Sequence, residues 1–120
     1  MSLGVIAIDH VQIAVPRALE KECLAFYREL LGPAEIAKPA ALRARGGAWF
    51  QLGDVQLHIG LDSEPSPSSR RHVCFVVADL AEARAQAEAS GIAVENEGET
   101  DLRRFFIYDP AGNRIEIGQR

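Results

Sequence analysis

The sequence "VQLHIG" at residues 55–60 is the key to the architecture, because it recurs in altered form as "NRIEIG" at residues 113–118. In both stretches apolar and polar residues alternate, which is the period of a strand with one buried face. His58 and Glu116 fall at the same position of the two copies. A strand that only covers a core needs neither an imidazole nor a carboxylate there, so the stretch raises a question of function as well as of fold.

Outward from these two strands, the chain reads as two copies of one unit. The alternation in "IDHVQIAV" (8–15) and "RHVCFVV" (71–77) predicts a first strand in each copy, and it places His10 and His72 at equivalent positions. A helix is expected after each first strand, over residues 16–32 and 79–91. The second helix carries Asp79 as its N-cap with Glu82 three residues later, which is a capping signature.

Three further strands are expected in each copy, so that each copy reads strand, helix and three strands. They are placed at 34–37, 48–52 and 55–60, and again at 92–95, 103–109 and 113–118. The repeat therefore spans residues 5–60 and 71–118, and the aperiodic stretch around "DSEPSPSSR" makes residues 61–70 a linker. We predict a single α+β domain covering residues 1–120.

Composition excludes several classes of partner. The formal net charge of −4 argues against a nucleic-acid or anionic-membrane surface, and no apolar run approaches the length of a membrane span. The start of the chain lacks the pattern of a signal peptide. Cys23 and Cys74 form no CxxC pair and are interpreted as small core residues, which together favours a reducing cytoplasm.

Three histidines and one glutamate carry the functional signal. The apolar faces of the four repeat-related strands are expected beneath the two helices, which leaves His10, His58, His72 and Glu116 on the opposite faces. If a pseudo-twofold axis relates the copies, those faces form one concave surface on which the four residues converge. Neutral imidazoles with a carboxylate are ligands of divalent Zn, Fe, Co, Ni or Mn. The alternative is a polar cavity that binds an organic ligand without metal.

Several other residues are candidates for lining such a pocket. Gln12 and Gln56 share the faces of the candidate ligands, and Arg104 is one of several arginines that could hold a carboxylate or phosphate. The aromatic candidates on the two third strands are Trp49, Phe50, Phe106 and Tyr108. Plain core or dimer packing for the aromatic residues, and an ordinary surface position for Arg104, are the competing interpretations.

The chain resembles the vicinal oxygen chelate superfamily, which includes glyoxalases, bleomycin-resistance proteins and extradiol dioxygenases. The resemblance is carried by "DHVQIAV", "FYRELLG", "RHVCFVVADL" and "FFIYDPAGNRIEI", which follow the family's order along nearly the whole chain. It implies two βαβββ modules in a cupped mixed sheet with the helices outside, usually in a homodimer. It also implies a metal site on the first and last strands of the modules, with His10, His72 and Glu116 as ligands and His58 as a fourth.

The resemblance leaves the chemistry open. Glyoxalase I-like members place a glutamate where this chain has His58, and a bound imidazole replaces a displaceable carboxylate base poorly. Fosfomycin-resistance-like thiol transferases and extradiol dioxygenases use a His/His/Glu set, although most extradiol enzymes are longer. Bleomycin-binding members lack the metal ligands.

We therefore expect a small metal-dependent lyase or isomerase that chelates vicinal oxygens of a small molecule, with Glu116 and His58 as catalytic candidates. The alternatives are a metal-independent drug- or metabolite-binding protein, a dioxygenase or thiol transferase, and an inactive dimerising module.

Overall fold

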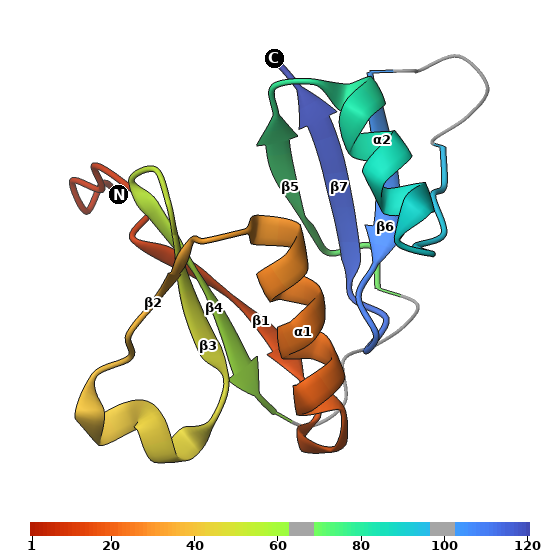
Figure 1. The fold of residues 1–120 in the computed structure, drawn as a ribbon. Helices are drawn as coiled ribbons and strands as arrows, with labels where there is room; N and C mark the ends of the chain where they lie inside the picture. The colour runs from red at the N-terminus through yellow and green to blue at the C-terminus, as the bar shows by residue number, and fades with distance from the viewer. Residues whose placement is uncertain (63–68, 97–102) are drawn as a thin grey trace. The chain divides into compact units, whose positions relative to one another are not determined.

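The computed structural model describes residues 1–62, 69–96 and 103–120 of the chain. These residues belong to two compact units, residues 1–65 and residues 66–120. Each unit is an open mixed sheet with one α-helix, which follows the first strand of the unit in both (Figure 1).

Unit 1 holds a four-stranded sheet in the order β1-β4-β3-β2. Strand β1 pairs in parallel with β4, and the other two pairings are antiparallel. The elements of unit 1 are β1 (His10–Val15), a 3₁₀ turn η1 (Arg17–Leu19), α1 (Glu20–Leu31), β2 (Glu35–Ile36), a 3₁₀ helix η2 (Ala40–Arg45), β3 (Ala48–Leu52) and β4 (Val55–Leu61).

Unit 2 repeats this arrangement with a three-stranded sheet in the order β5-β7-β6. Its first strand again pairs in parallel with its last, and the hairpin between the last two strands is antiparallel. Its elements are β5 (His72–Val77), α2 (Leu80–Ala89), β6 (Arg104–Tyr108) and β7 (Arg114–Gln119). The α+β class with two modules of one topology is therefore confirmed.

The expected elements differ from the observed ones at three places. The strand expected at 92–95 is a single bridge between Glu95 and Phe106, although its two backbone hydrogen bonds are short at 2.8 Å. The helix expected from residue 16 begins with the turn η1, and η2 was not predicted. Leu61 ends strand β4, and positions 63–68 of the expected linker lie outside the described residues.

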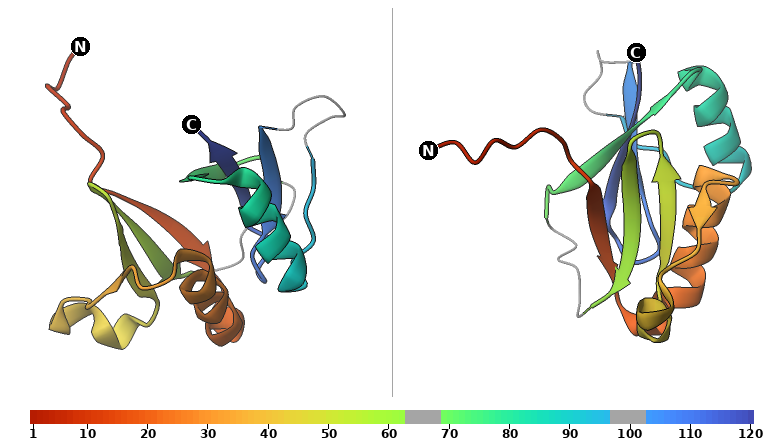
Figure 2. Two further views of the ribbon diagram at one scale, coloured as in Figure 1. Left: turned by 45° about the horizontal axis from the view of Figure 1, so that its top comes forward. Right: turned by 90° about the vertical axis from the view of Figure 1, so that its left-hand side faces the viewer.

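Each sheet has one apolar face that forms the core. In unit 1 this face includes Val15, Leu57 and Ile59, and in unit 2 it includes Ile107 and Ile115, all at most 2% exposed. Figures 1 and 2 show the helix of each unit running along its own sheet. The guanidinium of Arg84 on α2 lies 5.0 Å from the ring centre of Phe105, which places α2 on the apolar side.

A glycine fixes the junction between η2 and β3. Gly47 has φ +79°, and a Cβ atom there would lie 2.0 Å from the carbonyl oxygen of Ile59. Its amide donates to Oε2 of Glu20 on α1 over 2.7 Å. The close approach of β3 to β4 therefore depends on a missing side chain, and the same residue ties the helix to the sheet.

No helix among residues 1–62, 69–96 and 103–120 is long and apolar enough to cross a membrane.

Candidate functional site

The polar faces of the two sheets carry the candidate residues at equivalent positions. In unit 1 the register sets His58 between Gln12 on β1 and Trp49 on β3. Side chains that are paired across a sheet point to the same face, so these three residues share a surface opposite the core.

Unit 2 has the same arrangement around its last strand. Glu116 lies between Cys74 on β5 and Phe106 on β6. His58 and Glu116 therefore occupy equivalent positions on an inner strand of each sheet, as the repeat predicts.

Three rings stack on the polar face of unit 1. The imidazole of His58 lies between His10, with ring centres 4.2 Å apart, and Trp49, with ring centres 3.9 Å apart. The interplanar angles are 10° and 3°. His58 is 6% exposed. The rings therefore form a stacked column, and the two outer rings shield the central one from water.

A chain of directed hydrogen bonds fixes the proton position on His58. Gln51 donates from Nε2 to the carbonyl oxygen of Gly53 over 2.7 Å, so its Oε1 is left to accept from Gln56 Nε2 over 3.1 Å. Oε1 of Gln56 then accepts from Nε2 of His58 over 2.9 Å. In its neutral form His58 therefore carries its proton on Nε2 and its lone pair on Nδ1.

The electrostatics of the stack keep His58 neutral. Burial first, and then the neighbouring His10, lower the pKa of His58 below its usual value of 6.5. A neutral imidazole is the form that can bind a metal or accept a proton.

His10 has the opposite tautomer. Its Nδ1 lies 2.7 Å from Oδ2 of Asp9, and because a carboxylate only accepts, Nδ1 is the donor. Nε2 of neutral His10 is left with a lone pair. A carboxylate behind an imidazole is a common support of a metal ligand. Asp9 was not predicted as a site residue, although its place next to His10 in the sequence was the available signal.

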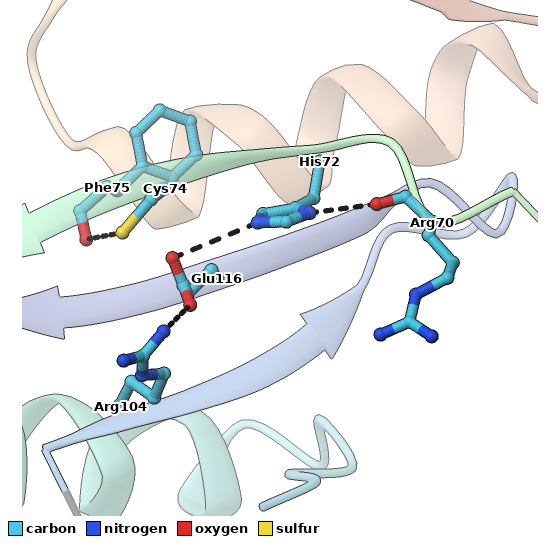
Figure 3. A network of polar contacts seen from close by, with 6 residues as sticks. All are labelled: Arg70, His72, Cys74, Phe75, Arg104 and Glu116. Atoms are coloured by element: carbon cyan, nitrogen blue, oxygen red, sulfur yellow. Dashed lines mark hydrogen bonds and ion pairs between the residues drawn. The ribbon is translucent and has the colours of Figure 1, made fainter. Parts of the chain in front are cut away.

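Figure 3 shows the corresponding network in unit 2, which is built on charge. Arg104 donates from Nη1 to Oε1 of Glu116 over 3.1 Å, while Oε2 lies 3.9 Å from Nε2 of His72. Nδ1 of His72 is 2.9 Å from the carbonyl oxygen of Arg70 and must be the donor of that bond. In neutral His72 the lone pair on Nε2 therefore faces a carboxylate oxygen, and two lone pairs that face each other make a place for a cation.

The thiol of Cys74 belongs to the same network. Its Sγ is 3.8 Å from the carbonyl oxygen of Phe75, and the residue pairs with Glu116 across β5 and β7. Hydrogen bonding from Cys74 first, and then the Arg104 guanidinium, hold the pKa of Glu116 below its usual value of 4.5. Partial burial of the sulfur, and then the Glu116 carboxylate, raise the pKa of the Cys74 thiol to about 11. Glu116 is therefore an anion that is 9% exposed.

The interpretation of both cysteines as core residues is wrong for one of them. Cys23 is fully buried in α1, whereas Cys74 is exposed. The reason is strand parity, because Cys74 is two residues from His72 and must share its face.

The pocket candidates divide between the faces. Gln12, Trp49 and Gln56 lie on the polar face of unit 1, and Arg104, Phe106 and Tyr108 lie on that of unit 2. The prediction for Phe50 is wrong. Phe50 pairs with Leu57 on the apolar face and is 0% exposed, because it is adjacent to Trp49 and must point the other way.

Arg114 was missed in the sequence, although it stands two residues before Glu116 and so shares its face. Its Cζ lies 3.8 Å from the centre of the Phe106 ring, and the same ring meets His72 edge-on at 5.8 Å.

The four candidate ligands form two pairs, His10 with His58 in unit 1 and His72 with Glu116 in unit 2. Within the described part of the chain, no three His, Cys, Asp or Glu side chains lie together as a ready set of ligands. The chemistry of the donors nevertheless fits a divalent ion, since His10 and His72 each present an Nε2 lone pair and Glu116 an anionic oxygen.

Comparison with known proteins gives consistent results. The family model for the Glyoxalase/Bleomycin resistance protein/Dioxygenase superfamily matches residues 7–117. A crystal structure of a Bacillus anthracis protein assigned to the glyoxalase family shares 38% sequence identity, covers 100% of this chain and 99% of its own, and has a TM-score of 0.85.

Two curated proteins are more distant. Glyoxylase I 4 of Arabidopsis thaliana is 26% identical over 96% of this chain and 71% of its own length. Glutathione transferase FosA of Serratia marcescens is 27% identical over 92% of this chain and 79% of its own length.

Proposed function

Because the chain belongs to the Glyoxalase/Bleomycin resistance protein/Dioxygenase superfamily, we propose that it is a metal-dependent enzyme acting on a small molecule with two vicinal oxygens. The proposed ligands of the ion are His10, His72 and Glu116. The observation that carries the proposal is the 3.9 Å approach of Nε2 of His72 to Oε2 of Glu116, which are both electron-pair donors when His72 is neutral. The donor types suit divalent Zn, Fe, Co, Ni or Mn.

When bound, the ion would act as a Lewis acid on a substrate oxygen. The chain's own residues would prepare the ligands for it. Arg104 occupies Oε1 of Glu116 and leaves Oε2 available, while the Arg70 carbonyl and the Asp9 carboxylate orient His72 and His10. Such outer hydrogen bonds hold ligand rings in position and are worth roughly 10–100-fold in metal affinity.

His58 has a different role in this proposal. Its Nε2 is committed to Gln56, so service as a fourth ligand would require either loss of that bond or coordination through Nδ1. We assign it to the wall of the site and to proton transfer, because its lone pair on Nδ1 can accept a substrate proton. Three protein ligands would then leave open positions on the ion for a chelating substrate.

The reaction we propose is that of a lyase or isomerase, in which a proton is removed next to a polarised oxygen and returned elsewhere on the substrate. A thiol transferase or a dioxygenase would use the same three ligand types.

Metal titration tests the proposal, and the chain supplies its own reporter. Trp49 is the single tryptophan and stacks on His58, so its fluorescence responds to changes in the site. We expect EDTA-treated protein to bind about one equivalent of Ni²⁺ or Zn²⁺ with a change in this signal. His72→Ala and Glu116→Gln should weaken binding by more than the 10–100-fold expected for Asp9→Asn. A chain that takes up no stoichiometric metal would refute the proposal.

A second candidate function is metal-independent capture of a drug or metabolite. The stack of His10, His58 and Trp49 supports it, since the outer face of a ring at the end of an aromatic stack can bind a planar ligand without any ion. Thermal stabilisation by such a ligand should then survive both EDTA and His72→Ala. If either treatment abolishes the stabilisation, this candidate fails.

We also propose that the protein acts as a homodimer in the cytoplasm. Light scattering coupled to gel filtration measures the mass, and a monomer of 13.1 kDa at micromolar concentration would contradict the dimer.

A further inference from the structure

The polar face of unit 2 carries two guanidinium groups with different surroundings. Arg104 donates to Glu116 over 3.1 Å, so its charge is compensated. Arg114 lies flat on Phe106 with its Cζ 3.8 Å from the ring centre, and it forms no ion pair with any described residue. Stacking on an aromatic face holds a guanidinium in place while the edge that carries its N–H groups stays available.

Arg114 is also close to the candidate metal ligands. It pairs directly with His72 across β5 and β7, and two residues along the same strand correspond to about 7 Å between it and Glu116. Phe106 contacts both His72 and Arg114. One aromatic ring therefore supports a candidate ligand and a cation side by side.

The repeat shows that this cation is specific to unit 2. The equivalent position in unit 1 is Gln56, which pairs with His10 across β1 and β4. Gln56 is neutral, and its amide is used to orient His58. The topology of the module therefore does not require a charge at this position.

Charge balance indicates what Arg114 would bind. Glu116 and Arg104 cancel each other, which leaves Arg114 uncompensated, and a divalent ion would add further positive charge. We propose that Arg114 binds a carboxylate of the substrate through its paired N–H groups, so that the substrate is an anion whose vicinal oxygens lie on the metal. This inference rests on the proposed function and names its substrate class.

A matched pair of chelators tests the inference. The compounds 3,4-dihydroxybenzoate and 3,4-dihydroxybenzamide present the same vicinal oxygens, and only the first carries a negative charge. Calorimetric titration into zinc-loaded protein should show tighter binding of the benzoate. Arg114→Gln, which copies the residue of unit 1, should weaken benzoate binding about tenfold or more while changing benzamide binding less than about twofold.

Controls separate the inference from the proposed function. Arg17→Gln removes the same charge from an exposed position of unit 1 and should leave both affinities unchanged. Zinc affinity, measured by Trp49 fluorescence, should be the same in wild type and Arg114→Gln. Failure of the wild-type protein to bind zinc would refute the proposed function. The benzoate and the benzamide would then be compared in the presence of EDTA. A preference for the benzoate that is lost in Arg114→Gln would still support the anion site.

Two results would overturn the inference. One is equal binding of the two compounds by wild type, or binding of neither. The other is an equal loss of both affinities in Arg114→Gln. Arg114→Lys keeps the positive charge but lacks the paired N–H groups of the guanidinium. Benzoate binding by this variant that is stronger than that of Arg114→Gln but weaker than that of wild type would support an electrostatic role.

Discussion

The two units share a topology but use it for different chemistry. Unit 1 presents three stacked rings and a row of amides on its polar face, and unit 2 presents a carboxylate, a thiol and two guanidinium groups. The exchanges are His58 for Glu116, Trp49 for Phe106, Gln56 for Arg114 and Gln12 for Cys74.

This difference shows how two sheets of one topology can carry different chemistry on their polar faces. The parallel pairing of first and last strands sets where the side chains stand, and it is common to both units. Side-chain identity then decides whether the residue on the last strand is held by stacking, as is His58 in unit 1, or by charge, as is Glu116 in unit 2. The two faces should therefore respond differently to substitution and to pH.

The largest expected effect concerns the backbone of unit 1. Gly47→Ala should destabilise the protein by about 3 kcal/mol, because its Cβ would meet the carbonyl of Ile59 at 2.0 Å in a left-handed conformation. Gly91→Ala in unit 2 has a similar φ of +77° with nothing within 4 Å, so it should cost only about 1 kcal/mol. Urea unfolding measures both, and equal losses would contradict a steric cause.

A smaller effect should distinguish the two hairpins. Oδ1 of Asp109 accepts from the amides of Ala111 and Asn113, each over 2.9 Å, and the residue is 3% exposed. Asp109→Ala should therefore cost about 2 kcal/mol, since it leaves two partly buried amide donors without their acceptor. Asp54 occupies the turn of the other hairpin and is exposed, so Asp54→Ala should change the free energy of unfolding by less than about 0.5 kcal/mol. A reversed order would mean that the β6–β7 turn does not depend on Asp109.

The smallest expected effects are two pH-dependent steps in stability. The pKa of His58 is lowered in the folded protein, so the unfolded chain binds more protons as the pH falls through 6.5, and stability should decrease there. The pKa of Glu116 is also lowered, so its contribution is complete above pH 4.5 and is lost as the pH falls through the lowered value. Urea unfolding between pH 8 and pH 3 would show both steps.

Variants assign the two steps to their units. His58→Phe should remove the step near pH 6.5 and keep the lower one. Glu116→Gln should keep the step near pH 6.5 and reduce the lower one, to which Glu35 also contributes because its hydrogen bond to Arg28 lowers its pKa. If one variant removes both steps, the two faces are not independent.

Much of the fold could be predicted because it depends on periodicity. Alternation in "VQLHIG" and "NRIEIG", together with the capping pair Asp79 and Glu82, marks elements that form as expected, and the cap bond is 3.0 Å long. Periodicity could not decide whether residues 92–95 form a strand, because a short apolar run does not indicate whether a neighbouring strand is available for pairing.

The candidate site was predicted less completely, for physical reasons. Phe50 was assigned to the pocket and Cys74 to the core on the basis of residue type. Their faces are instead decided by the alternation of side chains along a strand. The stack of His10, His58 and Trp49 joins three strands, so it requires a register that one strand's pattern cannot supply. Arg114 was missed because a guanidinium at the start of a strand looks the same whether or not an aromatic ring lies beneath it.

The hydrogen-bond chain from Gly53 to His58 has a consequence for how such a site can change over generations. The chain starts at the backbone carbonyl of Gly53, which can only accept a hydrogen bond whatever side chains surround it. Gln51, which bonds this carbonyl, can be replaced. In Gln51→Lys an ammonium donor would stand where the Gln56 amide now meets an acceptor. The amide of Gln56 would then turn over, and His58 would move its proton from Nε2 to Nδ1, which ¹⁵N chemical shifts of the ring would report. A single exposed substitution could thus remove the lone pair from Nδ1 of His58, and with it the ability of that atom to accept a proton, without changing any residue of the stack.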